Sequence, residues 1–477
     1  MLYPLVFLIY IGTLVLIGIL TSKKSKDVEN FYIGGRKIGP WVTALSFIAA
    51  YFSSVVIVGG GGFGYKFGMS TLWIGAINVL LGCTLAWIVL GKRIREFTTR
   101  LNTMTVPGFL AVRYKGNELR IFSAIVIVIF MVVYNVSILK GMGHIFEILM
   151  GIPYTTGVLL SGLVILFYVA IGGYLAVVWT SFFQAWVMFF GLIILTTGAL
   201  RAVGGLSTAN LKLAAMNPGF VSTPGVWGWA GLVSFALIVS FGVWGMPQLV
   251  VRFYSIKSTK ILKIGTVVAS LGGCMALLPY LNGAISRVLY PNLSNPDLAI
   301  PILTKNVLSP FGGAVFLAAV IAAGMSTFSA VLIIISGALI KDLLQDGFKI
   351  KLQEKKTVLF TRIATVIIGI ISLVIALKPP ALVLVLTAFA WAVIASTCLW
   401  PLLFGIYWKR TTRIGASLSM IGGCLTALIW MALGKPFNIH GFIPGIIMGF
   451  ILIVLGSILT PKLPKEHIQK VWGKNSS

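Results

Sequence analysis

Long uncharged stretches recur along almost the whole chain, and short clusters of charged residues separate them. The run 121–139, for example, contains no charged side chain. Because a helix of about twenty apolar residues crosses the hydrocarbon core of a bilayer, each stretch predicts a membrane-spanning helix. The predicted spans are 3–21, 40–60, 70–91, 120–149, 155–172, 177–200, 227–251, 263–286, 311–339, 358–377, 381–407, 413–433 and 441–460. The pattern predicts an all-α polytopic membrane protein with about thirteen transmembrane helices.

Composition agrees with this prediction, since 58% of the 477 residues are hydrophobic and only 10% are charged. Soluble domains carry roughly a quarter of charged residues. The net charge of +27 could indicate a nucleic-acid partner, but the basic residues lie in short loops without interleaved stacking aromatics. We therefore expect no nucleic acid and interpret the basic loops as markers of topology.

Basic residues occur in alternate loops, which sets the orientation. The first loop carries Lys23, Lys24, Lys26, Arg36 and Lys37, whereas the second carries only Lys66. Loops rich in lysine and arginine stay in the cytoplasm. The pattern predicts an outside N-terminus, an inside C-terminus and a multi-pass protein of the plasma membrane.

Two of the predicted spans contain glycine and proline where a helix would be interrupted. We expect span two to break at VGGGGFG (58–64) and span seven at FGVWGMPQ (241–248). Lipid cannot satisfy the backbone groups that a break releases, so such backbone lines a cavity or packs in protein. Paired broken helices in two inverted halves indicate the site of a secondary transporter; ordinary glycine-rich packing helices are the alternative.

Catalytic chemistry is not evident in the sequence. The only histidines are His144, His440 and His467, and no nucleophile–base pair, metal cluster or phosphate loop emerges. We therefore expect no enzyme and no organic cofactor. In span nine, Ala323, Ser326, Thr327 and Ala330 share one helical face; this stripe indicates either close helix packing or a sodium site built from hydroxyl and carbonyl oxygens.

Lys140 ends the uncharged run of span four and has three interpretations. At 1.5 Å per residue it lies about 30 Å along the helix from Arg120, at the outer interface, where a lysine can extend to water. We favour such an interface or vestibule anchor. Attraction of an anionic substrate, and a role as a sodium surrogate or in proton coupling, remain the alternatives.

Several motifs together resemble the sodium:solute symporter family, nearest to the branch with pantothenate, proline and monocarboxylate symporters. They are FYIGGRKIGPWVTALSFIAAYFSS, GIPYTTG, AIGGYLAVVWTSFFQAWVM, IAAGMSTFSAVLIIISGALIKDL and LWPLLFGIYWKRTTRIGA. The resemblance implies a leucine-transporter-like fold with two inverted five-helix repeats. The implied domain boundaries are one transporter domain at 1–462, made of an extra helix and loop at 1–38, repeats at 39–200 and 225–408 and two further helices at 409–462, then a tail at 463–477.

The resemblance also implies site residues. Sodium ligands would be the carbonyl groups of Ala49, Phe52 and Ala323 and the hydroxyl groups of Ser326 and Thr327. The residues expected to contact the solute are Ser53, Val55, Tyr134, Val243, Trp244, Pro247 and Trp391. Two positions depart from the family pattern, because Tyr51 and Ser181 stand where relatives carry aspartate.

We accordingly expect sodium-coupled symport, by alternating access, of a small organic solute such as pantothenate, a monocarboxylate or proline. A proton-coupled or uncoupled carrier of the same fold and a transporter-like membrane sensor are the alternatives. The expected partners are the solute, sodium and the lipid bilayer, with no obligatory protein partner.

Overall fold

The computed structural model describes residues 2–22, 27–379 and 381–473, so Lys23, Lys24, Lys26 and the end of the predicted tail lie outside the described residues. Within those ranges the chain is helical. The α-helices are α1 Leu2–Ser22, α2 Val28–Ile33, α3 Pro40–Tyr51, α4 Gly60–Phe67, α5 Leu72–Ile77, α6 Ala86–Arg100, α7 Val106–Tyr114, α8 Asn117–Met150, α9 Tyr154–Val203, α10 Leu206–Met216, α11 Gly228–Ser240, α12 Pro247–Ser255, α13 Leu262–Gly273, α14 Leu277–Leu289, α15 Ala299–Val307, α16 Pro310–Gly337, α17 Glu354–Ala376, α18 Val383–Tyr407, α19 Arg413–Ala432, α20 Phe442–Leu459 and α21 Lys465–Trp472.

Shorter helical turns join several of these elements. Two of them matter for the site: the π-helical turns η2 Val55–Gly59 and η11 Ala338–Gly347, which extend α4 and α16. Two 3₁₀ turns matter as well, η7 Gly242–Gly245 and η10 Pro296–Leu298.

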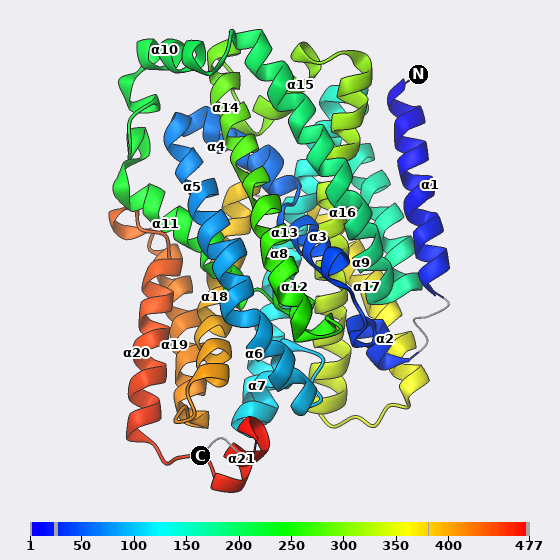
Figure 1. The fold of residues 1–477 in the computed structure, drawn as a ribbon, viewed down its shortest axis with the longest axis vertical. Coiled ribbons are helices and arrows are strands. Elements are labelled where there is room, and N and C mark those ends of the chain that lie inside the picture. Colours follow the sequence, from blue (N-terminus) through cyan, green and yellow to red (C-terminus); the bar gives the residue numbers. More distant parts are fainter. Residues whose placement is uncertain (1, 23–26, 380, 474–477) are drawn as a thin grey trace.

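The helices form a bundle whose two ends differ (Figure 1). Helix α1 begins at the upper end as drawn, where α10 and α15 also lie, and the last helix, α21, lies at the lower end below α7. In the described residues, eleven helical segments are long and apolar enough to cross a membrane. The fold class is as predicted, whereas the count of thirteen spans and the orientation stay predictions.

The centre of the bundle is α16. Of its most apolar window, 94% is buried inside the protein, against 17% for α1 at the edge. α16 packs on α9, α8 and α3. Small side chains at such interfaces allow helices to approach closely in a membrane. Ser309 caps its first turn by accepting from the Gly312 N–H at 3.2 Å.

The first interruption differs from the prediction in its position. α3 ends at Tyr51, and the chain leaves the helix at Phe52, with φ −88° and ψ 89°. The glycine run 58–64, where the break was expected, is helical. Its glycines make room for neighbours: a side chain on Gly64 would overlap the Tyr280 carbonyl of α14. The packing interpretation was therefore correct for this run, and the break at 58–64 was wrong.

The second interruption confirms the prediction. α11 ends at Ser240, the short turn η7 follows, and Met246 is extended with φ −84° and ψ 112° before Pro247 begins α12. A further interruption separates two predicted spans within α9, where Gly173 adopts φ 57° and ψ −154°. Glycine adopts these φ and ψ values at little cost because it has no Cβ atom.

Candidate functional site

The interruption after α3 leaves backbone oxygen atoms without helical partners, because the last carbonyl groups of an α-helix have no intrahelical donor. Side chains of α16 fill that gap. Ser326 Oγ donates to the Ala49 carbonyl at 2.7 Å, and Thr327 Oγ1 donates to the Ala50 carbonyl at 3.1 Å. The four residues are buried. Two hydroxyl groups of the central helix thus close the end of the first broken helix.

Four of the five predicted sodium ligands meet at this point. The Ala323 carbonyl lies 3.0 Å from Ser326 Oγ and 3.2 Å from Thr327 Oγ1. The fifth, Phe52, is the residue at which α3 ends. A hydroxyl oxygen can turn its hydrogen away and present a lone pair, so this cluster of oxygen atoms fits a small hard cation. The Ala50 carbonyl was not among the predicted ligands, because the resemblance implied only Ala49 and Phe52 in this segment and the sequence does not show that α3 ends at Tyr51.

An aromatic cluster lies on the other side of the first break. Trp391 of α18 stacks on Tyr51 of α3, with ring centroids 5.9 Å apart, and meets the edge of Tyr134 of α8 at 5.7 Å. Tyr51 also stacks on Phe52 at 5.0 Å. The structure therefore brings together two predicted solute contacts, Tyr134 and Trp391, from two different helices.

The second break packs against α18. A side chain on Gly245 would come 3.0 Å from the Ala395 Cα, which explains why glycine suits this position. Val243 is buried in the same turn. Trp244, however, packs on Phe241 and donates its indole N–H to the Leu81 carbonyl at 2.9 Å. Its ring is thereby placed toward the predicted third span.

The two breaks are tied to each other. The Tyr51 hydroxyl donates to the Val239 carbonyl in the last turn of α11. Asn78 Nδ2 donates to the same carbonyl at 3.3 Å. The oxygen cluster, the aromatic cluster and both interrupted helices therefore form one contiguous site in the middle of the bundle.

Comparison with known proteins identifies the family of the chain. The profile of the sodium:solute symporter family matches residues 31–423. The chain belongs to the sodium:solute symporter family. It is a multi-pass transporter of the plasma membrane, as are the members it resembles.

Two curated relatives in the family match nearly the whole chain. The osmoregulated proline transporter of Bacillus subtilis is 31% identical, over 98% of this chain and 96% of its own length. A sodium/pantothenate symporter of Haemophilus influenzae is 33% identical over the same shares. A solved Na⁺-coupled sialic acid symporter, in a substrate-bound outward-open state, superposes with a TM-score of 0.84 at 18% identity and covers 97% of this chain and 98% of its own. That likeness confirms the predicted fold.

Both departures from the family pattern are buried. Tyr51 fills its position with a ring that spans from Trp391 to the Val239 carbonyl, as described above. Ser181 lies on α9, and its Oγ has no hydrogen-bond partner in the described part of the protein. On the same helix, Tyr168 donates to the Met325 carbonyl of α16 at 3.2 Å. Neither position offers a carboxylate to a cation.

Ser53 and Val55 form the short segment between α3 and α4. The Val55 N–H donates to Ser53 Oγ at 3.2 Å, and both residues are buried. Ser54, between them, donates to the Ile138 carbonyl of α8 at 2.8 Å. A side chain on Gly141 would come 3.0 Å from Ser54 Oγ, so α8 passes very close to the break.

Lys140 does not extend to water as expected. It is only 9% exposed; its Nζ lies 3.6 Å from an Asp297 carboxylate oxygen and donates to the Ala381 carbonyl at 3.0 Å. The predicted extension to water was wrong because an acidic partner in η10, 157 residues away in the sequence, holds the ammonium group inside the protein. The interpretation as an anchor remains, but the anchor joins α8 to η10 and to the residues before α18.

Proposed function

We propose that the protein is a sodium-coupled symporter that imports a small organic carboxylate by alternating access. The observation that carries this proposal is the oxygen cluster, in which the hydroxyl groups of Ser326 and Thr327 face the released carbonyl groups of Ala49 and Ala50. The names of two relatives support the solute class, since proline and pantothenate are both carboxylates.

The cluster suits coupling because its ligands come from two different parts of the fold. Ala49 belongs to the first broken helix and Ser326 to the central helix α16. A cation held between them favours the arrangement in which both are close, and a ligand shifts an equilibrium only by such differential binding. Sodium entering along the membrane potential supplies about 2.3 kcal/mol per charge per 100 mV.

The solute would bind beside the first break. The proposed contacts at the break itself are Ser53 and Val55, and α8 and α18 contribute Tyr134 and Trp391. The second break contributes Val243 and Pro247. Aromatic rings offer apolar contact, and released backbone N–H groups at helix breaks can bind a carboxylate. Trp244 remains a proposed contact only if its indole leaves the Leu81 carbonyl.

Orientation and organisation complete the proposal. The loops that follow α7, precede α17 and follow α18 are basic and lie at the lower end of Figure 1, so we assign this end to the cytoplasm. The two inverted repeats would be 39–200 and 225–408, each beginning with a broken helix. In this proposal the protein works without catalysis, organic cofactor, nucleic acid or obligatory protein partner.

Uptake into proteoliposomes tests the proposal. A panel of proline, pantothenate and short monocarboxylates is offered under a sodium gradient, a potassium gradient or a proton gradient. We expect accumulation of one solute class with sodium alone. Accumulation that follows only the proton gradient would favour the proton-coupled alternative, in which Ser326 and Thr327 are packing residues. Sodium-independent binding of a solute without flux would favour a sensor.

Variants of the oxygen cluster sharpen that test. Ser326→Ala or Thr327→Ala removes one oxygen ligand, so the sodium concentration for half-maximal uptake should rise about tenfold, the equivalent of about 1.4 kcal/mol, while saturating sodium restores most of the rate. Ser336→Ala is the matched control, because Ser336 is a buried serine of the same helix that donates to its own Leu332 carbonyl at 2.8 Å. An equal effect of all three variants would contradict the assignment.

A further inference from the structure

Asp342 is a buried carboxylate that the proposed transport site does not use. It lies in η11, which continues α16 toward the lower end, and its exposed fraction is 0%. Thr105 donates to one carboxylate oxygen at 2.7 Å, whereas the other oxygen has no hydrogen-bond partner in the described residues. Asp342 follows the predicted span 311–339 by three residues, and the sequence alone does not show that it is completely buried. An ionisable group inside a membrane protein marks a functional site by default.

The cationic side chains nearby are engaged elsewhere. Arg120 of α8 lies 3.3 Å from Asp346, and Lys341 lies 3.1 Å from the same carboxylate. In the described ranges no lysine, arginine or histidine nitrogen lies within 4.0 Å of Asp342. The other buried aspartate, Asp297, has Lys140 as its partner. Asp342 is therefore a buried acid with no cation in direct contact, although Arg120 and Lys341 still attract it from a greater distance.

One partial compensation comes from α7. Thr105 is the N-cap of that helix and also accepts from the Gly108 N–H at 3.0 Å. The positive end of the helix dipole near the carboxylate favours its ionised form by a fraction of a full charge. Together with the Thr105 hydrogen bond and the more distant Arg120 and Lys341, this support does not replace a cation in contact, so the buried carboxylate still gains from binding a cation or a proton.

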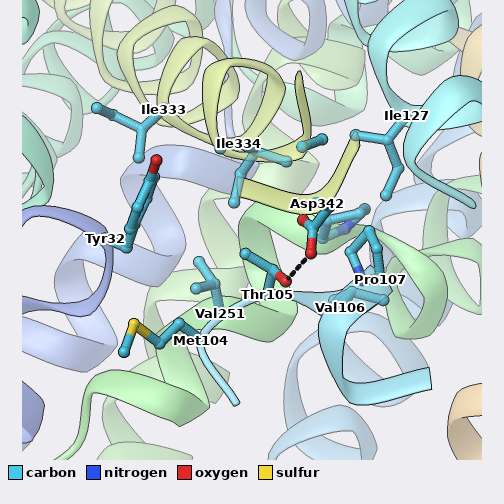
Figure 2. A pocket seen from close by; sticks show the side chains of 13 residues that line it. Tyr32, Met104, Thr105, Val106, Pro107, Ile127, Val251, Ile333, Ile334 and Asp342 are labelled. Carbon is cyan, nitrogen blue, oxygen red and sulfur yellow. Dashed lines mark hydrogen bonds between the residues drawn. The ribbon is translucent and has the colours of Figure 1, made fainter. Parts of the chain in front are cut away.

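A small cavity opens in front of the carboxylate, as Figure 2 shows. Its volume is about 20 Å³, enough for a single water-sized particle. Beside Asp342, it is lined by Ile334 of α16, by Ala338 at the start of η11, and by Pro247 and Val251 of α12. The cavity is thus bounded on one side by the inner half of the second broken helix, immediately below the break.

The same helix face joins this cavity to the oxygen cluster. Thr327, Val331, Ile334 and Ala338 recur at helical spacing, and Asp342 follows four residues later. In a regular α-helix Asp342 would lie about 60° out of line with Thr327, at about 100° per residue. The wider π-helical turns of η11 rotate less per residue and return Asp342 to that face, about 22 Å from Thr327 at 1.5 Å per residue.

We propose that the Asp342 carboxylate is a transient binding site for the monovalent cation that leaves Ser326 and Thr327 toward the cytoplasm. This inference rests on the proposed sodium coupling and on the proposed orientation. The carboxylate supplies the negative charge that the oxygen cluster itself lacks, since Tyr51 and Ser181 are neutral. It attracts the departing cation along the face of α16 and exchanges it with the cytoplasm once α12 moves away.

The first experiment uses the wild-type protein in membranes and a hydrophobic carbodiimide, which modifies buried carboxyl groups. Sodium chloride on the cytoplasmic side should slow modification of Asp342 several-fold relative to the same concentration of choline chloride. Asp346, one turn further along, is the internal control and should react equally in both salts. Both sites are quantified by peptide mass spectrometry.

A variant separates direct binding from an effect transmitted by the oxygen cluster. In a Ser326→Ala, Thr327→Ala protein the sodium protection of Asp342 should persist, because the cation contacts the carboxylate itself. Loss of protection there, or equal modification in both salts in a wild-type protein whose uptake depends on sodium, overturns the inference. Wild-type uptake that does not depend on sodium is a different result, which overturns the proposed function.

Substitution provides an independent measurement. Asp342→Asn keeps the bond from Thr105, because the amide oxygen still accepts, but it removes the charge. Sodium-driven uptake should slow about tenfold, the equivalent of about 1.4 kcal/mol in a barrier, with the external sodium concentration for half-maximal uptake unchanged. Asp342→Glu should recover much of the rate, and Asp346→Asn should stay near wild type. An unchanged rate in Asp342→Asn contradicts the inference; if that variant fails to fold, the carbodiimide experiment decides.

Discussion

Lys140 and Asp297 form an ion pair in a region from which water is largely excluded, with exposed fractions of 9% and 3%. A buried pair contributes little net stability when intact, but removing one partner strands the other charge. Asp297 is further held by the Val383 N–H at 3.3 Å. The pair therefore fixes three segments, α8, η10 and the start of α18, relative to one another.

This arrangement predicts the behaviour of two single variants and their combination. Lys140→Ala and Asp297→Ala should each destabilise the protein by about 3–5 kcal/mol, because each leaves an unpaired buried charge. The double variant should recover a large part of that loss. Thermal unfolding in detergent measures all three. Independent, additive losses would show that the two groups do not depend on each other, and a selective loss of solute affinity in Lys140→Ala would favour the role in substrate attraction.

The sequence could predict the hydroxyl groups of Ser326 and Thr327, because their spacing and the family resemblance point to the same helix face. It could not predict the partner of Lys140. A contact between residues 157 positions apart depends on how distant helices pack against each other, and local sequence patterns carry no such information. The burial of Asp342 was missed for the same reason, since Thr105 of the α7 N-terminus covers it from another part of the chain.

Helix α4 and helix α14 approach each other so closely that backbone meets backbone. A side chain on Gly283 would overlap the Gly61 carbonyl, and one on Gly64 would overlap the Tyr280 carbonyl. Small residues at helix interfaces permit such contact in membranes. The glycine run was mistaken for a break because glycine serves both purposes, and only the neighbouring helix distinguishes them.

Substitution of a glycine at this contact should destabilise the folded protein strongly. Gly283→Ala forces the two helices apart, and we expect destabilisation of about 1–3 kcal/mol or more, the range for overpacked cores. Gly12→Ala in α1 is the control, because nothing lies within 4 Å of the added methyl group. Thermal unfolding and the yield of folded protein provide the comparison. Equal stability of the two variants would mean that α4 and α14 are not held at this distance.

The molecule as a whole follows the alternation of hydrophobic and basic segments that the sequence displays. The first helix, α1, begins at one end of the bundle and the last, α21, lies at the other (Figure 1), and the predicted odd number of crossings would lead to this arrangement. Hydropathy could predict an all-helical membrane protein because lipid demands continuous apolar helices. It could not show that α16 is central and α1 peripheral, since both are uniformly apolar.

Cysteine labelling tests the orientation. In a background with the exposed Cys274 replaced by serine, a cysteine at position 349 should react only from the cytoplasm. Cysteines at positions 66 and 378 should react only from outside. All three positions are exposed, so access to reagent and not burial determines the result. Reaction of position 349 from outside would invert the topology and the assignment of Asp342 to the exit route.

The hydroxyl groups of Ser326 and Thr327 satisfy the Ala49 and Ala50 carbonyl groups by themselves. After it releases its solute and ion, a symporter must change back to the outward-open state while empty. During that step, oxygen atoms of an empty site that had no hydrogen between them would repel one another. Here two hydroxyl protons take the place of the ion, so the idle carrier keeps its central helices together. The two side chains that we propose as cation ligands would then also set how fast the empty protein becomes ready for the next turnover.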